Sequence, residues 1–337
     1  MSDISSEDEK AKKYTQLGKY RMPNKNNYRQ HAHCNPLSKI SMNYPFSPEC
    51  INWSLCYPYE FSSTTTKSNS TLYLNTKTCP APFTNEKFKP ISTSNFPKNF
   101  FNLPYVSVVD VGCGYGALLE NMSHDLEGGH LALGMEIRDK VTNYVGERIK
   151  GLRINTDNKE FNNISVMRCN TMKLLLNFFY KGQLSKLFFC FADPHFKRTN
   201  HRKRIINQYL LNEYSYLLKK GGRLYIITDV EELFIWERTM LNQNKSFKEL
   251  TNDEIENDIF TNFMKNTNEA KKVIKSGGKM YYSIYERVES KINSLSELYD
   301  CLEYTKDEKE EDILKVLFFS VLFLFSPKSI FNRIQKI

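Results

Sequence analysis

Residues 106–116 read VSVVDVGCGYG, and this stretch decides the fold. Its first half, residues 106–111, is a short β-branched apolar run, which predicts a buried strand. The run ends in a cluster of three glycines, Gly112, Gly114 and Gly116. Glycines between a strand and a helix allow a tight turn and let the backbone approach a ligand closely. The stretch therefore predicts a strand, a ligand-binding loop and the start of a helix.

Strands and helices alternate along the chain from this point. Apolar runs predict the strands, and the segments between them predict the helices. The expected strands are 106–111, 131–137, 164–167, 186–192, 224–228 and 279–288, and the expected helices are 115–124, 139–153, 172–180, 202–219 and 231–242. Alternation of this kind indicates an α/β fold in which helices cover both faces of a parallel sheet.

Two acidic residues flank the glycine cluster. Asp110 precedes it, and Glu136 follows at the end of the next expected strand. A carboxylate at that place can accept hydrogen bonds from both hydroxyls of a ribose. The GxGxG spacing differs from the GxGxxG spacing that suits a dinucleotide pyrophosphate. The pattern resembles the cofactor site of the Rossmann-like S-adenosylmethionine-dependent methyltransferases; a structural turn and a nicotinamide site are the alternatives.

Asn170 and Thr171 lie where the third expected strand ends. In a methyltransferase fold of this kind that position faces the adenine, so Asn170 is a candidate adenine or ribose contact. The alternative is that Asn170 only caps the helix that follows, since asparagine is a preferred N-cap residue.

Residues 191–204 read FADPHFKRTNHRKR and place an acid and several cations just beyond the fourth expected strand. Ligands in open α/β sheets lie outside the carboxyl ends of the strands, so Asp193 should emerge where a methyl acceptor sits. No acidic residue occurs from 194 to 212. We expect the cations to contact RNA phosphates, with a solvated helix face as the alternative. The residues concerned are Lys197, Arg198, Arg202, Lys203 and Arg204.

Several motifs together resemble the tRNA (guanine-N7)-methyltransferases of the eukaryotic catalytic-subunit type. They are YRQHAHCNP (28–36), GCGYG (112–116), GMEIR (134–138), FADPHFKRTNHRKR (191–204), GGRLYIITDV (221–230) and TNEAKKVIKSGGK (267–279). The resemblance implies a Rossmann-like, mostly parallel seven-stranded sheet that uses S-adenosylmethionine. It also implies methylation of a guanosine in the tRNA variable loop, a WD-repeat partner subunit that does not itself catalyse, and a location in the nucleus, with the cytoplasm as a further location left open.

The resemblance also carries roles over to individual residues. Asp193 matches the position called catalytic. Residues that match cofactor-binding positions, together with the second glycine of the loop, are Gly112, Gly114, Glu136, Arg138, Asn170, Thr171, Cys190, Thr267 and Glu269. Two positions depart from the family pattern: Ala192 replaces a proline, and Cys34 replaces a serine found in many relatives.

Guanine N7 carries a free lone pair, so its methylation needs no base, and catalysis should be mainly positioning. Asp193 is expected to accept hydrogen bonds from the guanine N1–H and amino group. Two other functions remain open. One is methylation of an exocyclic amine, because DPHF partly matches the (Asn/Asp)-Pro-Pro-aromatic loop of amino-methyltransferases. The other is a non-catalytic RNA-binding subunit on the same fold.

The composition of the rest of the chain predicts how it divides into segments. We expect a disordered polar tail at 1–28, a segment packing on the catalytic domain at 29–61, a low-complexity insertion at 62–100, a methyltransferase domain at 101–290 and an extension at 291–337. The apolar run at 313–325 is short for a membrane span. Eight cysteines without a CxxC pair are expected to be reduced, and no metal site is expected. The net charge of +9 is compatible with an anionic partner, but on its own it is weak evidence for one.

Overall fold

The structure is a computed structural model that describes residues 20–31, 34–39, 42–61, 72–84, 104–126 and 128–289. Every helix and strand named below belongs to one compact unit that ends at Val288. The disordered tail expected at 1–28 falls largely outside the described residues, and the apolar run at 313–325 falls entirely outside them.

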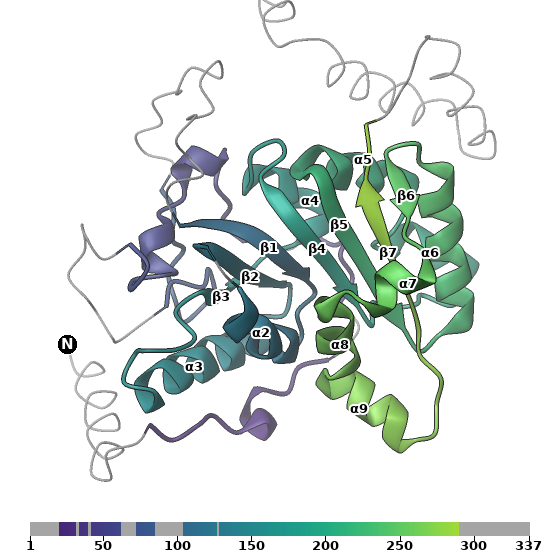
Figure 1. The fold of residues 1–337 in the computed structure, drawn as a ribbon. Coiled ribbons are helices and arrows are strands. Elements are labelled where there is room, and N and C mark those ends of the chain that lie inside the picture. Colours follow the sequence, from purple (N-terminus) through teal and green to yellow (C-terminus); the bar gives the residue numbers. More distant parts are fainter. Residues whose placement is uncertain are drawn as a thin grey trace, which may run out of the picture. The chain divides into compact units, whose positions relative to one another are not determined.

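A seven-stranded sheet forms the centre of the unit (Figure 1). Its strands are β1 (Tyr105–Val111), β2 (His130–Glu136), β3 (Ile164–Arg168), β4 (Leu184–Cys190), β5 (Leu218–Thr228), β6 (Phe247–Glu249) and β7 (Tyr281–Arg287). The spatial order is β3-β2-β1-β4-β5-β7-β6. The first five strands are parallel, and β7 is antiparallel to both of its neighbours. The expected mostly parallel, Rossmann-like sheet is confirmed.

The strand order reverses between β1 and β4. From β1 the chain proceeds outward through β2 and β3, then returns to place β4 on the other side of β1. A reversal of this kind leaves a crevice at the carboxyl ends of the two central strands, where ligands bind in open α/β sheets. The glycine loop follows β1 and the DPHF loop follows β4, so the fold brings the two motifs to one place.

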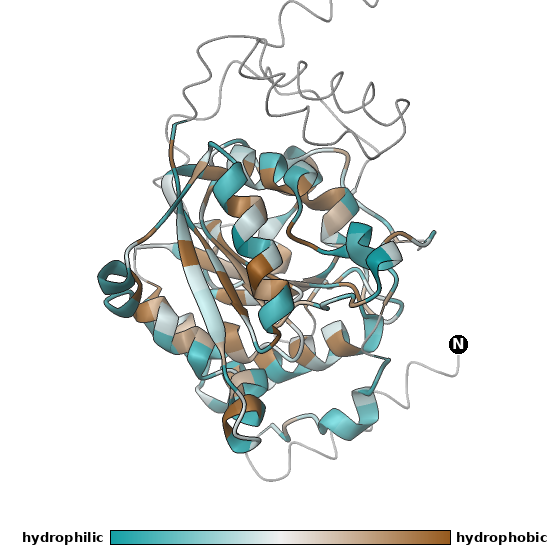
Figure 2. Cartoon of the chain, turned by 90° about the vertical axis from the view of Figure 1, so that its right-hand side faces the viewer, coloured by the Kyte–Doolittle hydropathy of each residue, from teal (hydrophilic) through white to brown (hydrophobic). Residues whose placement is uncertain are grey.

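Helices lie on both faces of the sheet (Figures 1 and 2). They are α2 (Ala117–Met122), α3 (Asp139–Asn155), α4 (Thr171–Leu174), α5 (Gln208–Leu217), α6 (Glu231–Gln243), α7 (Asn252–Glu256), α8 (Ile259–Lys265) and α9 (Asn268–Lys275). Figure 2 shows helices that carry both hydrophobic and hydrophilic residues, as expected of elements with one side on a core. Within the described ranges, no helix is long and apolar enough to cross a membrane.

Neighbouring residues of a strand supply two separate cores, because successive side chains point to opposite faces. Val108 and Phe188 pack in one core with residues of α2, α3 and α8. Val109 and Phe189 pack in the other with residues of α5 and α6. Both sheet faces are therefore buried, which explains why apolar residues occur at successive positions of the parallel strands.

The segment before the sheet contributes to the second core. Ile51 and Tyr57 are buried there. The Tyr57 hydroxyl donates to the Ala132 carbonyl at 2.8 Å, and Trp53 stacks on Phe179 with ring centroids 6.1 Å apart. These contacts tie residues 51–57 to the sheet and to the chain that follows α4.

The expected low-complexity insertion at 62–100 is wrong in its central part. Residues 72–84 are described, and Leu72 and Leu74 are buried. The Leu74 carbonyl accepts a hydrogen bond from the Arg168 amide at 2.8 Å, and Phe83 forms an isolated bridge with Ile51. Polar residues dominate the composition of 62–100 and obscure the few apolar side chains that enter the core.

The single helix expected at 202–219 is also wrong. A 3-10 helix, η8 (Arg198–Lys203), comes first, and α5 begins separately at Gln208. Asn207 caps α5, since its side chain accepts from the Leu210 amide at 3.0 Å. The lysines and glycines at 219–222, expected to end a helix, lie within β5, where Gly221 has a φ of +76°. Short elements that were not expected are β6, α7, α8 and α9.

Candidate active site at the carboxyl edge of the sheet

The glycine loop after β1 combines left-handed backbone with open space. Gly112, Gly114 and Gly116 have φ values of +73°, +52° and +80°. A Cβ on Gly112 would meet nothing within 4 Å, and on Gly114 it would meet only the Gly112 carbonyl oxygen at 4.0 Å. A Cβ on Gly116 would lie 2.8 Å from Val145 Cγ1. The first two glycines therefore border space that a ligand could fill, and the third allows close packing on α3.

Glu136 holds the loop from the end of β2. The buried carboxylate accepts from the Gly114 amide at 3.2 Å through Oε2. Arg138 donates three hydrogen bonds to the same carboxylate. Its amide and Nε donate to Oε1 at 2.9 and 3.1 Å, and its Nη2 donates to Oε2 at 3.0 Å. Arg138 thus fixes the orientation of an acceptor-only group beside the glycine loop, as ribose recognition requires.

Asp110 is buried at the end of β1 and lacks a complete set of partners. Among the described residues, nothing donates a hydrogen bond to its Oδ1 atom. Burial, together with the nearby carboxylates of Glu269 and Glu136, raises the pKa of Asp110 to about 8. A buried acceptor without a donor is costly, so a ligand carrying N–H groups or positive charge would stabilise this residue.

Asn170, at the start of α4, resembles Asp110 in having a buried acceptor atom that lacks a donor among the described residues. Its Nδ2 donates to the Pro36 carbonyl at 2.7 Å, and its buried Oδ1 has no partner within the described part of the chain. The side chain makes no capping bond to α4. The alternative that Asn170 serves only as a helix cap therefore does not describe what its side chain does. Thr171 follows as the first residue of α4 and is buried.

Of the three remaining cofactor candidates, Glu269 and Cys190 lie near Asp110, and Thr267 caps the helix that carries Glu269. Thr267 caps α9 through its hydroxyl, and Glu269 lies in the first turn of that helix, close enough to Asp110 to affect its pKa. Cys190 ends β4, and burial raises the pKa of its thiol, with Asp110 and Glu269 adding to the effect. Residues from β1, β4 and α9 thus meet at one edge of the sheet.

One segment beside this edge is hard to identify from the sequence. The Lys25 ammonium lies 4.7 Å from the centroid of the Tyr115 ring, next to the glycine loop. Burial lowers the pKa of Lys25, and Glu269 acts in the opposite direction. The Lys140 amide donates to Gln30 Oε1 at 2.9 Å. Only the family-like stretch 28–36 pointed to this part of the chain.

The DPHF loop leaves β4 through strained backbone. Phe191 and His195 have φ values of +53° and +45°, which is unfavourable for residues other than glycine. The Phe191 amide donates to the Ile227 carbonyl of β5 at 2.7 Å. Between these two residues lies Asp193, whose Oδ1 accepts from the His195 amide at 3.3 Å and whose side chain is 28% exposed. A partly exposed carboxylate therefore stands three residues beyond Cys190.

Four of the five expected RNA-binding cations lie toward solvent. Lys197, Arg198 and Arg202 are exposed and Lys203 is half-buried. No carboxylate of a described residue forms an ion pair with any of them. They lie in or directly before the 3-10 helix η8, which follows the DPHF loop, and their role in binding RNA stays a prediction.

The fifth cation, Arg204, was wrongly grouped with them. Its side chain is only 2% exposed. Its Nη2 donates to Glu232 Oε1 at 2.8 Å and its Nε donates to the Pro194 carbonyl at 2.9 Å. A guanidinium committed in this way cannot contact RNA phosphates. Residues 194–212 contain no acid, so the local sequence does not reveal this ion pair. The partner, Glu232, lies in α6.

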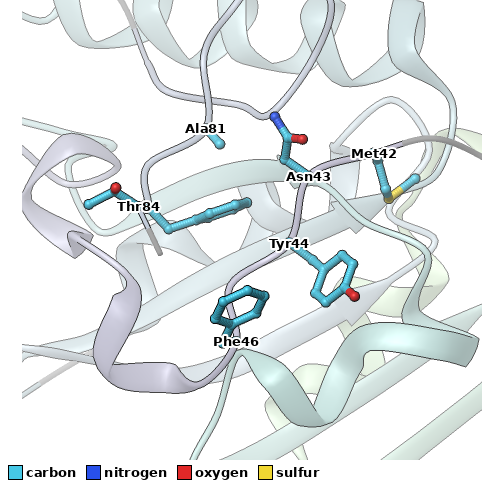
Figure 3. Close-up of a pocket in the computed structure, with 7 residues that line it drawn as sticks. Met42, Asn43, Tyr44, Phe46, Ala81 and Thr84 are labelled. Atoms are coloured by element: carbon cyan, nitrogen blue, oxygen red, sulfur yellow. The ribbon is translucent and has the colours of Figure 1, made fainter. Parts of the chain in front are cut away.

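A pocket of about 400 Å³ lies elsewhere (Figure 3). Segments 42–46 and 81–84 line it, and Figure 3 shows the rings of Tyr44 and Phe46 side by side at its edge. None of its lining residues belongs to the glycine loop, the DPHF loop or α9. No group of three His, Cys, Asp or Glu residues in the described ranges could hold a metal ion.

Known proteins are similar to this chain in sequence over most of its length. Residues 104–283 match a family model described as "Putative methyltransferase". A tRNA (guanine-N(7)-)-methyltransferase of Schizosaccharomyces pombe is 40% identical over 293 residues, covering 84% of this chain and 93% of the relative. One of Arabidopsis thaliana is 38% identical over 268 residues, covering 79% and 92%. One of Neurospora crassa is 38% identical over 277 residues, covering 80% and 88%. The chain belongs to the tRNA (guanine-N7)-methyltransferase family.

Proposed function

We propose that this chain transfers a methyl group from S-adenosylmethionine to N7 of a guanosine in the variable loop of tRNA. The observation that carries the proposal is the position of Asp193. Its partly exposed carboxylate stands just beyond the edge where Asp110, Cys190 and Glu269 meet. The carboxylate that would select the base therefore lies next to the residues that fit the cofactor.

The residues at the edge of the sheet fit S-adenosylmethionine. Glu136 offers a fixed acceptor for ribose hydroxyls, and Asp110 Oδ1 and Asn170 Oδ1 are buried acceptors that lack donors among the described residues. The space beside Gly112 and Gly114 admits a ligand against the backbone. When bound, S-adenosylmethionine supplies an electrophilic methyl group on a positively charged sulfur.

Asp193 selects and orients the base in this mechanism. Its carboxylate accepts hydrogen bonds from the N1–H and the amino group of guanine, a donor pair that adenine does not present. N7 needs no deprotonation, so the protein contributes orientation and a suitable electrostatic environment. Lys197, Arg198, Arg202 and Lys203 hold phosphates of the folded RNA, which fixes its position without reading its sequence.

Family membership supports two further parts of the proposal. A WD-repeat subunit would pair with this chain and hold the tRNA beside it. The complex would act in the nucleus, which fluorescence microscopy of the tagged chain would test.

The proposal is tested by product mapping. Unmodified tRNA is incubated with the chain and S-adenosylmethionine, with and without a WD-repeat partner, and then treated with borohydride and aniline. We expect cleavage at a variable-loop guanosine, because a methyl group on N7 makes that nucleotide labile. Methylated tRNA that resists cleavage would indicate an exocyclic amine as the acceptor. Absence of methyl transfer under both conditions, despite cofactor binding, would indicate a non-catalytic subunit.

A further inference from the structure

Arg204 lies behind the DPHF loop and is held on three sides. Nε donates to the Pro194 carbonyl at 2.9 Å, and Nη2 donates to Glu232 Oε1 at 2.8 Å. The guanidinium carbon lies 4.9 Å from the centroid of the Trp236 ring. A planar guanidinium can serve an acceptor, a carboxylate and an aromatic face together, which an ammonium group cannot.

The partners of Arg204 are themselves fixed. Trp236 Nε1 donates to the Ile206 carbonyl at 2.9 Å, and the Arg204 amide donates to the His201 carbonyl at 2.9 Å. Glu232 and Trp236 lie one turn apart on α6, so both approach Arg204 from the same rigid element. Arg204 therefore connects the DPHF loop to α6.

The loop needs such a connection because its backbone is strained on both sides of Asp193. A left-handed conformation is unfavourable for a residue other than glycine, and Phe191 and His195 both adopt it. Strain of this kind persists only where surrounding contacts fix it. One contact lies before Asp193, from the Phe191 amide to the Ile227 carbonyl. Another lies directly after it, from Arg204 to the Pro194 carbonyl.

We propose that Arg204 is a positioning residue that sets the orientation of the Asp193 carboxylate by anchoring the Pro194 carbonyl to α6. The mechanistic consequence rests on the proposed function, whereas the anchoring does not. Loss of the anchor releases the strained loop, so Asp193 samples orientations that do not match guanine. Cofactor binding is unaffected, because Glu136, Asp110 and Asn170 lie on other elements.

The first α6 turn offers a matched pair of variants. Glu231→Gln and Glu232→Gln each remove one negative charge from exposed residues of that turn, and only Glu232 contacts Arg204. Glu232 is 58% exposed, so its substitution should not prevent folding. Arg204→Met removes the anchor itself, and Arg204→Lys keeps the charge without the forked geometry. Each variant is assayed for S-adenosylmethionine affinity, kcat and KM for tRNA, and hydrogen exchange of the peptide 191–199.

We expect Arg204→Met to lower kcat at least ~10-fold while the cofactor Kd stays within about twofold, with Arg204→Lys intermediate. Glu232→Gln should lower kcat roughly threefold and speed exchange of 191–199, and Glu231→Gln should do neither. A purely structural role predicts lower thermal stability with kcat per cofactor-binding site unchanged, which would overturn the proposal.

A role of Arg204 in contacting tRNA phosphates would overturn the proposal too. That role predicts a higher KM for tRNA and a weaker salt dependence of tRNA binding, with kcat unchanged. If Arg204→Met does not fold, the comparison of Glu231→Gln with Glu232→Gln tests the proposal by itself. If the wild-type chain fails to form N7-methylguanosine, the proposed function fails. The exchange comparison between Glu231→Gln and Glu232→Gln still tests the anchor in that case: equal exchange in the two variants contradicts it.

Discussion

The acidity of Asp110 depends strongly on its surroundings. In water an aspartate has a pKa of about 3.8, and burial beside Glu269 and Glu136 raises that of Asp110 to about 8. Without a ligand, Asp110 is therefore neutral in the folded protein at physiological pH and charged in the unfolded chain. Between these two values the unfolded state binds fewer protons, so folding loses stability as pH rises.

The substitution Asp110→Asn tests this at constant shape, since asparagine mimics the neutral acid. From pH 5 to pH 8, the free energy of unfolding of the ligand-free wild type should fall relative to the variant by at most about 1.4 kcal/mol per pH unit. Denaturant titrations across this range measure the difference. The comparison isolates Asp110 from other buried acids, such as Glu237, whose pKa burial also raises to about 8. A difference that is flat with pH, or that grows in favour of the wild type, contradicts the assignment.

Arg204 shows the limit of judging a residue by its sequence neighbours. The residues that precede it are basic and polar, so the stretch resembles a continuous phosphate-binding surface. The partners that bury it, Glu232 and Trp236, lie about thirty positions later on α6. Only the folded chain brings them together. Asp110, Gly112 and Glu136 were identifiable because their motif is local to two adjacent strand ends.

At the scale of the elements, the strands were easier to predict than their ends. The apolar run at 186–192 predicted β4, yet the strand stops at Cys190 because Phe191 turns to left-handed backbone. The three-residue β6 is too short to show a period. Helices α7 to α9 are only five, seven and eight residues long, so each is too short for the local pattern to distinguish it from a loop. Tertiary contacts decide such features, and a single sequence does not contain them in readable form.

The cations around the 3-10 helix η8 should act on RNA affinity and not on the chemical step. We expect Arg202→Gln/Lys203→Gln to reduce the slope of log affinity for tRNA against log salt by roughly 1 to 2, since each lost phosphate contact removes about 0.7–0.9. Filter binding over a range of salt concentrations gives the slope.

The control is Lys159→Gln/Lys248→Gln, two exposed lysines remote from the carboxyl edge. Lys159 lies beyond the end of α3, near the opposite edge of the sheet, and Lys248 lies in β6. If both double variants change the slope equally, the effect is one of total charge and the placement of the RNA on η8 is wrong.

Residues 72–84 should behave as part of the core. Leu74 is buried and its side chain lies against Gly146 of α3. Leu74→Ala should lower the free energy of unfolding by about 2–5 kcal/mol, as large-to-small changes in cores do. Leu37→Ala is the matched control, because Leu37 is 39% exposed and should cost little. Equal stability of the two variants, measured by denaturant unfolding, would show that 72–84 is a dispensable insertion after all.

At the scale of the whole molecule, the fold separates two tasks and places them next to each other. The loop after β1, the end of β2 and the start of α9 surround the space suited to the cofactor. The DPHF loop and η8 form the part that we propose binds RNA, and this part follows Cys190 at the end of β4. Family membership is consistent with this division, since the motifs that carry the resemblance occur in both parts.

The central claim is that Asp193 orients the base and takes no part in holding the cofactor. The most direct measurement is the single-turnover rate of N7 methylation by Asp193→Ala at saturating tRNA, together with its calorimetric affinity for S-adenosylmethionine. We expect turnover to be abolished, a loss of at least about 100-fold, while the cofactor affinity stays close to that of the wild type. Methylation that persists within about tenfold of the wild-type rate, with the cofactor bound equally well, would contradict the claim.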